Sequence, residues 1–241
     1  MQQRFLRWFA AVWLAAAGSS VSAQPIDLPD LPQCSAVVPT AVALDNLPVT
    51  LDVRILLDGV SQQRAAQIVS VAQQAFSPLQ LTLRPSYEAR NLSGNDAVGL
   101  MQQAKARYGG RRPPGIDMVY VLTNKDITLE PTGNAAVGAA ECIGGVAYPD
   151  RAFAVGEAKD IARTDLVVYS LAANYAAKAF AHEIGHLLGG MHEYANCGES
   201  AVITGDSPCT LMFNIADIQK LLFSTLNSTV VRANAQLFAR P

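Results

Sequence analysis

The chain has 241 residues, a formal charge of −2 at pH 7, and hydrophobic side chains at 50% of its positions. A chain of this length can bury a substantial core as one domain. Its weakly acidic balance predicts neither nucleic acid nor an anionic membrane surface as a partner.

The first 23 residues have the layout of a secretory signal peptide. Arg4 and Arg7 form a positively charged front end, the run from Trp8 to Ala17 is apolar, and small residues end the segment at Ala23. A membrane anchor is the alternative, but the apolar run is shorter than the ~20 residues that a spanning helix needs. We therefore expect export to the periplasm or the extracellular space, removal of residues 1–23, and no membrane anchor afterwards.

The N-terminal half of the remaining chain predicts two strands and two helices. Residues 24–48 are rich in proline and have no clear period, which favours an extended arm. Leu51, Val53 and Ile55 alternate with polar residues in a first strand, VTLDVRILLDG, and the leucines at 79, 81 and 83 alternate in a second. Ser61 can cap a helix that Pro78 stops, and Asp96 can cap a helix that runs to Tyr108.

Further strands and helices are expected in the second half. The run IDMVYVLTN is apolar almost throughout, which predicts a strand covered on both faces. GGVAY and RAFAVGE are two short β-like pieces, and a long helix is expected from about Ser170 to Leu188. Asn214 can cap a last helix, NIADIQKLLFSTL. Strands that alternate with helices predict an α/β layered domain with a largely parallel sheet.

All three histidines of the chain lie in one segment, AHEIGHLLGGMHEY. His182 and His186 are one helical turn apart on the same face, so both could bind one Zn²⁺ at about 2.0–2.1 Å. Gly189 can end the helix in the left-handed conformation that glycine adopts without steric cost, which lets the chain fold back to His192. Three protein ligands leave a fourth position for water, as a catalytic zinc requires.

Glu183 lies beside these ligands without being one of them. From the neighbouring sector of the helix it could reach a zinc-bound water as general base. For the five residues HEIGH taken alone, the alternative is an apolar helix whose histidines are packed in the core. The complete HExxHxxGxxH string favours zinc hydrolase chemistry instead.

The segment HEIGHLLGGMH, with a methionine downstream in CTLMFN, resembles the metzincin zinc metallopeptidases. Cys209, shortly before Met212, is similar to the reprolysin (adamalysin)-like group within them. After the third histidine, Glu193 stands where that group usually has aspartate. A glutamate at this position is similar to the astacin pattern, but Asn214 stands where astacins carry a tyrosine ligand.

The resemblance implies a metzincin-like α/β fold: a mixed, mostly parallel twisted sheet with an active-site helix, then a small irregular C-terminal subdomain that ends in a helix. It divides residues 49–241 into an upper subdomain to about residue 189 and a lower subdomain over 190–241. The implied activity is zinc-dependent endopeptidase cleavage with one catalytic Zn²⁺, in which Glu183 assists attack by the zinc-bound water. Met212 would form the turn beneath the metal.

Substrate contacts also follow from this resemblance. An edge strand that pairs with extended substrate is expected at GGVAYP, with Gly145, Val146, Ala147 and Tyr148 as its contact residues. The pocket wall is expected after Met212, at Phe213, Asn214 and Ile215.

The chain has four cysteines, an even number that favours two disulfides in an exported protein. Cys197 with Cys209 would close a short loop beneath the site, which leaves Cys34 to pair with Cys142. An alternative for Cys34 is a latency switch, in which its thiolate occupies the fourth zinc position and Cys142 has no partner.

These observations leave more than one function open. The main hypothesis is a monomeric zinc endopeptidase that acts on peptide or protein substrates. The alternatives are a non-catalytic zinc-containing binding module and a zinc hydrolase dedicated to a single target, such as a toxin. The presence of Glu183 favours catalysis over the binding module, because a non-catalytic site needs no general base.

Overall fold

The computed structural model describes residues 32–34, 44–45, 47–130, 132–159, 174–192, 209–213 and 220–239. All of them belong to one unit that spans residues 31–241. The expected signal peptide, with most of the expected N-terminal arm, lies outside the described residues.

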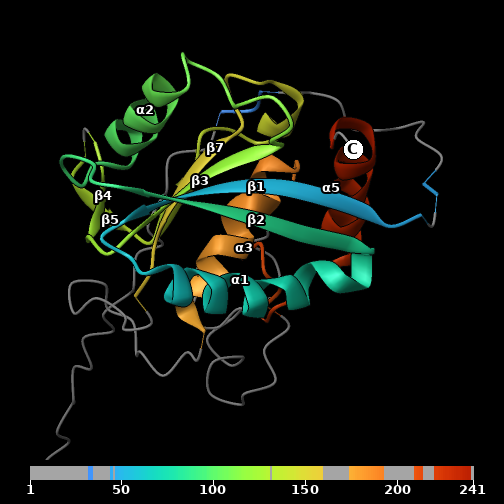
Figure 1. Ribbon diagram of the computed structural model, residues 1–241. Helices are drawn as coiled ribbons and strands as arrows, with labels where there is room; N and C mark the ends of the chain where they lie inside the picture. The colour runs from blue at the N-terminus through green and yellow to red at the C-terminus, as the bar shows by residue number, and fades with distance from the viewer. Residues whose placement is uncertain are drawn as a thin grey trace, which may run out of the picture. The chain divides into compact units, whose positions relative to one another are not determined.

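A five-stranded sheet forms the centre of this unit (Figure 1). Its strand order is β2-β1-β3-β7-β6; the first four strands run parallel, and β6 is antiparallel to β7. A separate antiparallel pair, β4 with β5, follows β3 in the chain. The strands are β1 (Val49–Asp58), β2 (Leu81–Arg90), β3 (Met118–Thr123), β4 (Ile127–Leu129), β5 (Asn134–Ala136), β6 (Gly138–Ala140) and β7 (Phe153–Glu157). The predicted α/β class with a mixed, mostly parallel sheet is confirmed.

Helices cover both faces of the sheet. Helices α1 (Gln62–Phe76) and α3 (Tyr175–Leu187) pack on one face and α2 (Ala97–Arg107) packs on the other (Figure 1). The two predicted caps are present: the Ser61 hydroxyl accepts from the Arg64 N–H at 3.2 Å, and the Asp96 carboxylate accepts from the Gly99 N–H at 2.7 Å. Helix α5 (Thr225–Phe238) is the last element.

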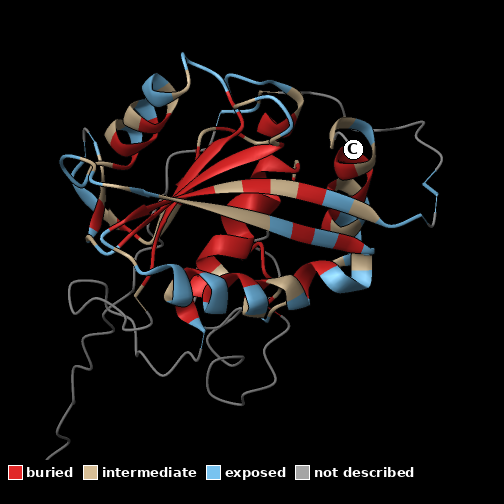
Figure 2. Ribbon diagram, in the orientation of Figure 1, coloured by how far each residue is buried: buried red, intermediate tan, exposed pale blue. Residues whose placement is uncertain are grey.

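Side chains of β3 alternate between two hydrophobic clusters. Met118, Tyr120 and Leu122 face the cluster that contains α1 and α3, whereas Val119 and Val121 face the cluster that contains α2. Every residue of β3 is buried, as the apolar run predicted. Figure 2 shows the same burial along α3, which therefore lies in the core rather than on the surface.

Two predicted helices differ from the structure where it describes them. Asn174 has a left-handed φ of +68°, so α3 begins only at Tyr175. The last helix was expected from Asn214, which lies outside the described residues. Residues 220–224 are not helical, and the Ser224 hydroxyl caps α5 by accepting from the Asn227 N–H at 3.3 Å.

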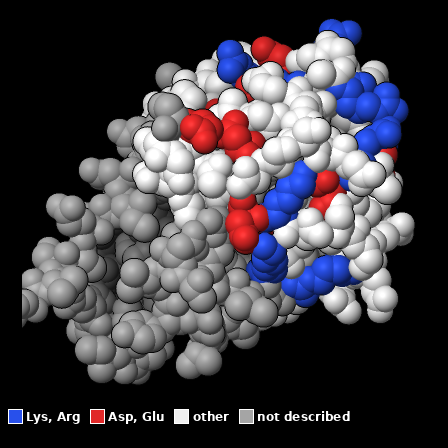
Figure 3. All heavy atoms as spheres, turned by 90° about the vertical axis from the view of Figure 1, so that its left-hand side faces the viewer, with Lys and Arg blue, Asp and Glu red and all other residues white. Residues whose placement is uncertain are grey.

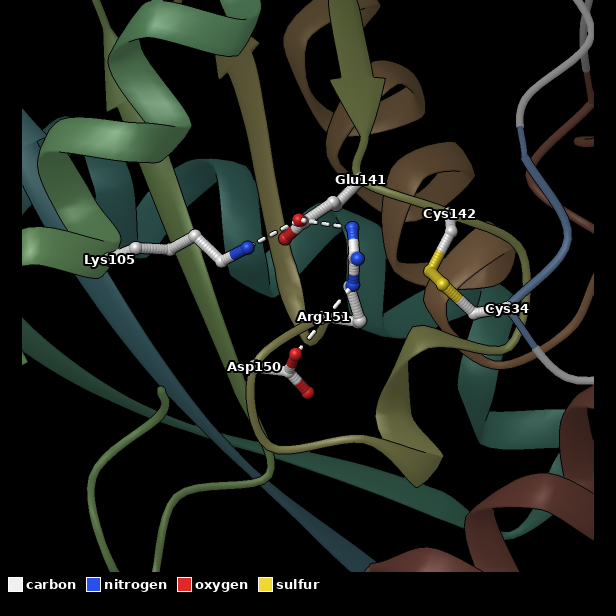
Figure 4. Close-up of a disulfide and its surroundings, with 6 residues drawn as sticks. All are labelled: Cys34, Lys105, Glu141, Cys142, Asp150 and Arg151. Carbon is white, nitrogen blue, oxygen red and sulfur yellow. Dashed lines mark hydrogen bonds and ion pairs between the residues drawn. A yellow bond between two sulfur atoms is a disulfide. The ribbon is translucent and has the colours of Figure 1, made fainter. Parts of the chain in front are cut away.

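One disulfide joins Cys34 to Cys142 (Figure 4). Beside the bond, the Cys34 N–H donates to the Ile143 carbonyl, and the Ile143 N–H donates to the Pro32 carbonyl, each at 3.1 Å. The neighbouring Glu141 carboxylate forms ion pairs with Lys105 and Arg151. The segment 32–34 is therefore held to the loop that follows β6 by covalent and backbone contacts together.

Acidic and basic side chains are interspersed on the face drawn in Figure 3. Among the ion pairs of the described residues, Glu88 pairs with Arg54, Arg90 and Arg107. Among the described residues, no helix combines the length and the apolar character needed to cross a membrane.

Candidate metal centre and active site

The three histidines bring one nitrogen each to a common point. The Nε2 atom of His186 lies 2.9 Å from Nε2 of His182 and 3.0 Å from Nε2 of His192, and the latter two are 3.2 Å apart. Two nitrogens bound tetrahedrally at ~2.0–2.1 Å would be separated by roughly 3.3 Å, which is close to the observed spacing. The sequence-predicted residues His182, His186 and His192 thus form one group that could hold a metal ion.

Backbone carbonyls fix the tautomers of two of these rings. Nδ1 of His182 lies 2.7 Å from the Leu211 carbonyl oxygen, and Nδ1 of His186 lies 2.8 Å from the Gly190 carbonyl oxygen. Because a carbonyl only accepts, each Nδ1 carries the hydrogen and each Nε2 presents a lone pair to the common point. Neutral rings with converging lone pairs are what a divalent cation such as Zn²⁺ requires.

Burial keeps these two rings neutral. Burial, together with the neighbouring His192, lowers the pKa of His182 to about 4. The pKa of His186 is held well below its ordinary value by burial and then by the other two histidines. Both rings therefore remain unprotonated at neutral pH, and protons compete little with a metal for them.

The turn after α3 positions the third candidate ligand, His192. Gly189 has a φ of +89°, as expected for the residue that ends this helix. An ideal Cβ at Gly189 would lie 2.7 Å from Nδ2 of Asn234 in α5, so the turn is also tightly packed. Asn227, also in α5, accepts from the Met191 N–H at 2.9 Å and donates to the Met191 carbonyl at 3.0 Å. The residue directly before His192 is thus held by α5.

Met212 packs against α3. It is fully buried, and an ideal Cβ at Gly185 would lie 2.8 Å from its sulfur atom. Gly185 stands between His182 and His186 in sequence, so Met212 packs against the helix segment that carries both ligands. The neighbouring Leu211 supplies the carbonyl that orients His182.

Glu183 is buried beside the candidate metal ligands, with 5% of its surface exposed. Burial raises the pKa of Glu183 to about 8, although a hydrogen bond from the Ala140 backbone lowers it in part. An ideal Cβ at Gly138 would lie 2.8 Å from Oε1 of Glu183. The carboxylate therefore lies directly against β6, in contact with both Gly138 and Ala140.

The predicted edge strand at GGVAYP is wrong. Gly145, Val146 and Ala147 form a 3₁₀ turn that Tyr148 follows, because Gly144 adopts a φ of +78° and the Tyr148 N–H bonds back to the Gly145 carbonyl at 3.0 Å. An ideal Cβ at Gly145 would overlap the Arg151 carbonyl oxygen. The antiparallel strand at the edge of the sheet is β6, which begins upstream at Gly138.

The remaining expected site residues are only partly described. Phe213 is buried, whereas Asn214 and Ile215 lie outside the described residues. Cys209 is disulfide-bonded, and its expected partner Cys197 lies outside the described residues. Because the sulfur of Cys34 is bonded to that of Cys142, it is no thiolate that could bind a metal.

Sequence reasoning missed three contributors to the site: Gly138, Ala140 and Asn227. Gly138 has no side chain and Ala140 has only a methyl group, so neither residue carries a chemical signature. Asn227 lies one residue after the expected last helix, which ended at Leu226. Their roles arise from contacts between segments far apart in sequence.

Comparisons with known proteins identify a family and a similar fold. Residues 64–193 match the model of the reprolysin-like metallopeptidases of family M12B, a range that contains all three histidines and Glu183. No curated protein matches the chain. The fold is similar to the crystal structure of archaemetzincin from Methanopyrus kandleri, with a TM-score of 0.54 and 17% sequence identity over 78% of this chain and 96% of that chain. At that identity the similarity concerns the fold alone.

Proposed function

Because the chain belongs to the reprolysin-like M12B family of metallopeptidases, we propose that it is an exported zinc-dependent endopeptidase. The observation that carries this proposal is the convergence of three histidine Nε2 atoms within 3.2 Å of one another, next to a buried carboxylate. His182, His186 and His192 would hold the zinc ion. Glu183 contributes no atom to the group that could hold the metal and so remains available for proton transfer.

Zinc, when bound, supplies Lewis-acid chemistry that polarises the scissile carbonyl and acidifies the attacking water. Glu183 takes a proton from that water and later returns it to the leaving amine. The buried carboxyl is protonated at pH 7 without a cation, since its pKa is about 8. A nearby positive charge favours its ionised form, which is the form a general base needs.

The substrate would lie along β6. This strand is at the end of the sheet order and pairs with β7 on one side. An extended peptide that pairs with its other side would pass over the Glu183 carboxylate, which contacts Gly138. Phe213, with Asn214 and Ile215, is proposed to line the pocket that selects a substrate side chain.

Export is supported by the Cys34–Cys142 disulfide, because such bonds persist in oxidising compartments. The expected signal peptide at residues 1–23 would direct the chain to export. N-terminal sequencing of the exported protein tests this part, with Gln24 as the expected first residue.

Digestion of a peptide library tests the enzymatic part. The zinc-loaded protein is incubated with a mixed library whose peptides have acetylated N-termini and amidated C-termini, with and without a chelator. We expect internal cleavage, detected by mass spectrometry, that chelator abolishes and added zinc restores. Trimming of unblocked control peptides alone would contradict the endopeptidase assignment. Binding of peptides without cleavage would favour the non-catalytic alternative.

A further inference from the structure

Two glycines face each other beneath the active-site helix. Gly138 of β6 and Gly156 of β7 are direct partners in the antiparallel register. An ideal Cβ at Gly138 would lie 2.8 Å from Oε1 of Glu183, and one at Gly156 would overlap the hydroxyl oxygen of Tyr120. Cβ positions of directly opposed residues are about 4.5–5.5 Å apart. The Glu183 carboxylate and the Tyr120 hydroxyl therefore occupy adjacent positions that side chains would otherwise fill.

Both groups retain hydrogen-bonding capacity that no described protein atom uses. Tyr120 is fully buried, and its hydroxyl has no hydrogen-bond partner among the described residues. The same holds for Oε2 of Glu183. A buried hydroxyl and a buried carboxylate oxygen are a natural donor and acceptor for one bridging water, which satisfies both.

Of the two carboxylates whose charges act on Tyr120, Glu183 lies on the same face of the sheet as Tyr120 and Glu157 lies on the other. The Tyr120 ring packs on Phe180 of α3, with the ring centroids 4.4 Å apart. Burial first, and then the charges of Glu183 and Glu157, raise the pKa of Tyr120. Glu157 is two residues after Val155 on β7 and therefore shares its face, the one covered by α2. Its Oε1 accepts from the Ile127 N–H at 2.7 Å.

We propose that the Tyr120 hydroxyl donates a hydrogen bond through one buried water to Oε2 of Glu183 and so fixes the orientation of this carboxylate. Tyr120 is a positioning residue, because it acts through Glu183 and touches no substrate. Together with the Ala140 backbone, it would hold the carboxylate from two directions. The kinetic consequence rests on the proposed peptidase function, whereas the hydrogen bond itself does not.

The kinetic experiment compares Tyr120→Phe with Tyr108→Phe in the zinc-loaded protein. Both substitutions remove one phenol hydroxyl that faces a carboxylate, since Tyr108 donates to Glu88 at 2.7 Å, far along the sheet from the metal centre. We expect Tyr120→Phe to lower kcat about 10-fold with KM and zinc content unchanged, and Tyr108→Phe to leave kcat within about twofold. An unchanged kcat in Tyr120→Phe, or a lower zinc content, would overturn the proposal.

A second measurement does not depend on peptide cleavage by the protein. In protein labelled with ¹³C at tyrosine Cζ, the Tyr120 resonance is identified by its loss in Tyr120→Phe. We expect Glu183→Gln to shift this resonance and Glu157→Gln to leave it in place. A resonance that shifts in Glu157→Gln and not in Glu183→Gln would show that the Tyr120 hydroxyl interacts with Glu157, and would overturn the proposal. If the protein cleaves no peptide but the Glu183→Gln shift is present, the proposed function fails while the hydrogen bond stands.

Discussion

The side-chain amide of Asn227 forms two hydrogen bonds with the backbone of Met191, the residue before His192: the Met191 N–H donates to Oδ1 at 2.9 Å, and Nδ2 donates to the Met191 carbonyl at 3.0 Å. Asn227 belongs to α5, whereas Met191 belongs to the turn after α3. The third candidate ligand is thus positioned by a helix that itself provides none. We therefore expect the affinity of the three histidines for zinc to depend on α5.

Replacing Asn227 with alanine should weaken zinc binding. The substitution removes both bonds to Met191 and so allows His192 to leave its position, which we expect to lower the zinc affinity roughly 10-fold. It should also cost about 1–3 kcal/mol of unfolding free energy. Competition with a zinc-binding dye measures the first effect and denaturant unfolding the second. Thr229→Ala, at an exposed position of the same helix, is the control, and equal zinc affinities in the two variants would contradict this role.

Glu183→Gln should separate metal binding from turnover. The amide is nearly isosteric with the carboxylate and lies outside the group that could hold the metal, so we expect one zinc per chain as in the native protein. Since glutamine accepts no proton, kcat should fall by about 10²–10⁴. Metal analysis and peptide cleavage are measured on the same preparation. Near-native turnover would show that Glu183 is not the general base.

Zinc binding at pH 7 should release a proton from Glu183. Without metal its pKa of about 8 keeps most of the carboxyl protonated at pH 7, and the charge of a bound cation lowers that pKa. Because His182 is already neutral at this pH, it contributes no proton. Calorimetric titrations in buffers of different ionisation enthalpy should give about one proton more for the native protein than for Glu183→Gln. The difference should vanish near pH 9 and above, where the native carboxyl is already ionised.

The disulfide should stabilise the fold by restricting the conformations of the unfolded chain. Cys34 and Cys142 are separated by 108 positions, so their bond closes a long loop and removes much conformational freedom from the unfolded chain. Replacing both with serine should cost about 2–5 kcal/mol of unfolding free energy. Denaturant unfolding under oxidising conditions provides the measurement. A double-serine variant as stable as the native protein would show that the bond adds no constraint.

The sequence predicted the local features of the site well. The pairing of His182 with His186 depends on helical spacing, and the turn to His192 depends on one glycine, so short-range rules suffice for both. The buried strand at 118–123 and the caps at Ser61 and Asp96 are equally local. These are the parts of the fold that periodicity and side-chain chemistry determine without knowledge of distant segments.

The predictions that the structure contradicts depend on contacts between distant segments. Strand β6 consists of Gly138, Ala139 and Ala140, which have no intrinsic preference for a strand, and it forms because β7 offers hydrogen bonds. GGVAY contains better strand formers, yet the left-handed Gly144 turns the chain there instead. Strand pairing overrode local preference in β6, and a left-handed glycine did so in GGVAY, so the edge strand was expected in the wrong place.

The Cys34–Cys142 bond also decides which preparation of the protein gives a meaningful metal stoichiometry. Chain made in a reducing cytosol would carry these two sulfurs as thiols, and thiolates bind zinc as readily as imidazoles do. Ions held by misfolded or reduced chains would then be counted together with those at the histidines. In the oxidised protein both sulfurs of this pair are occupied, so neither adds to the zinc count attributed to His182, His186 and His192.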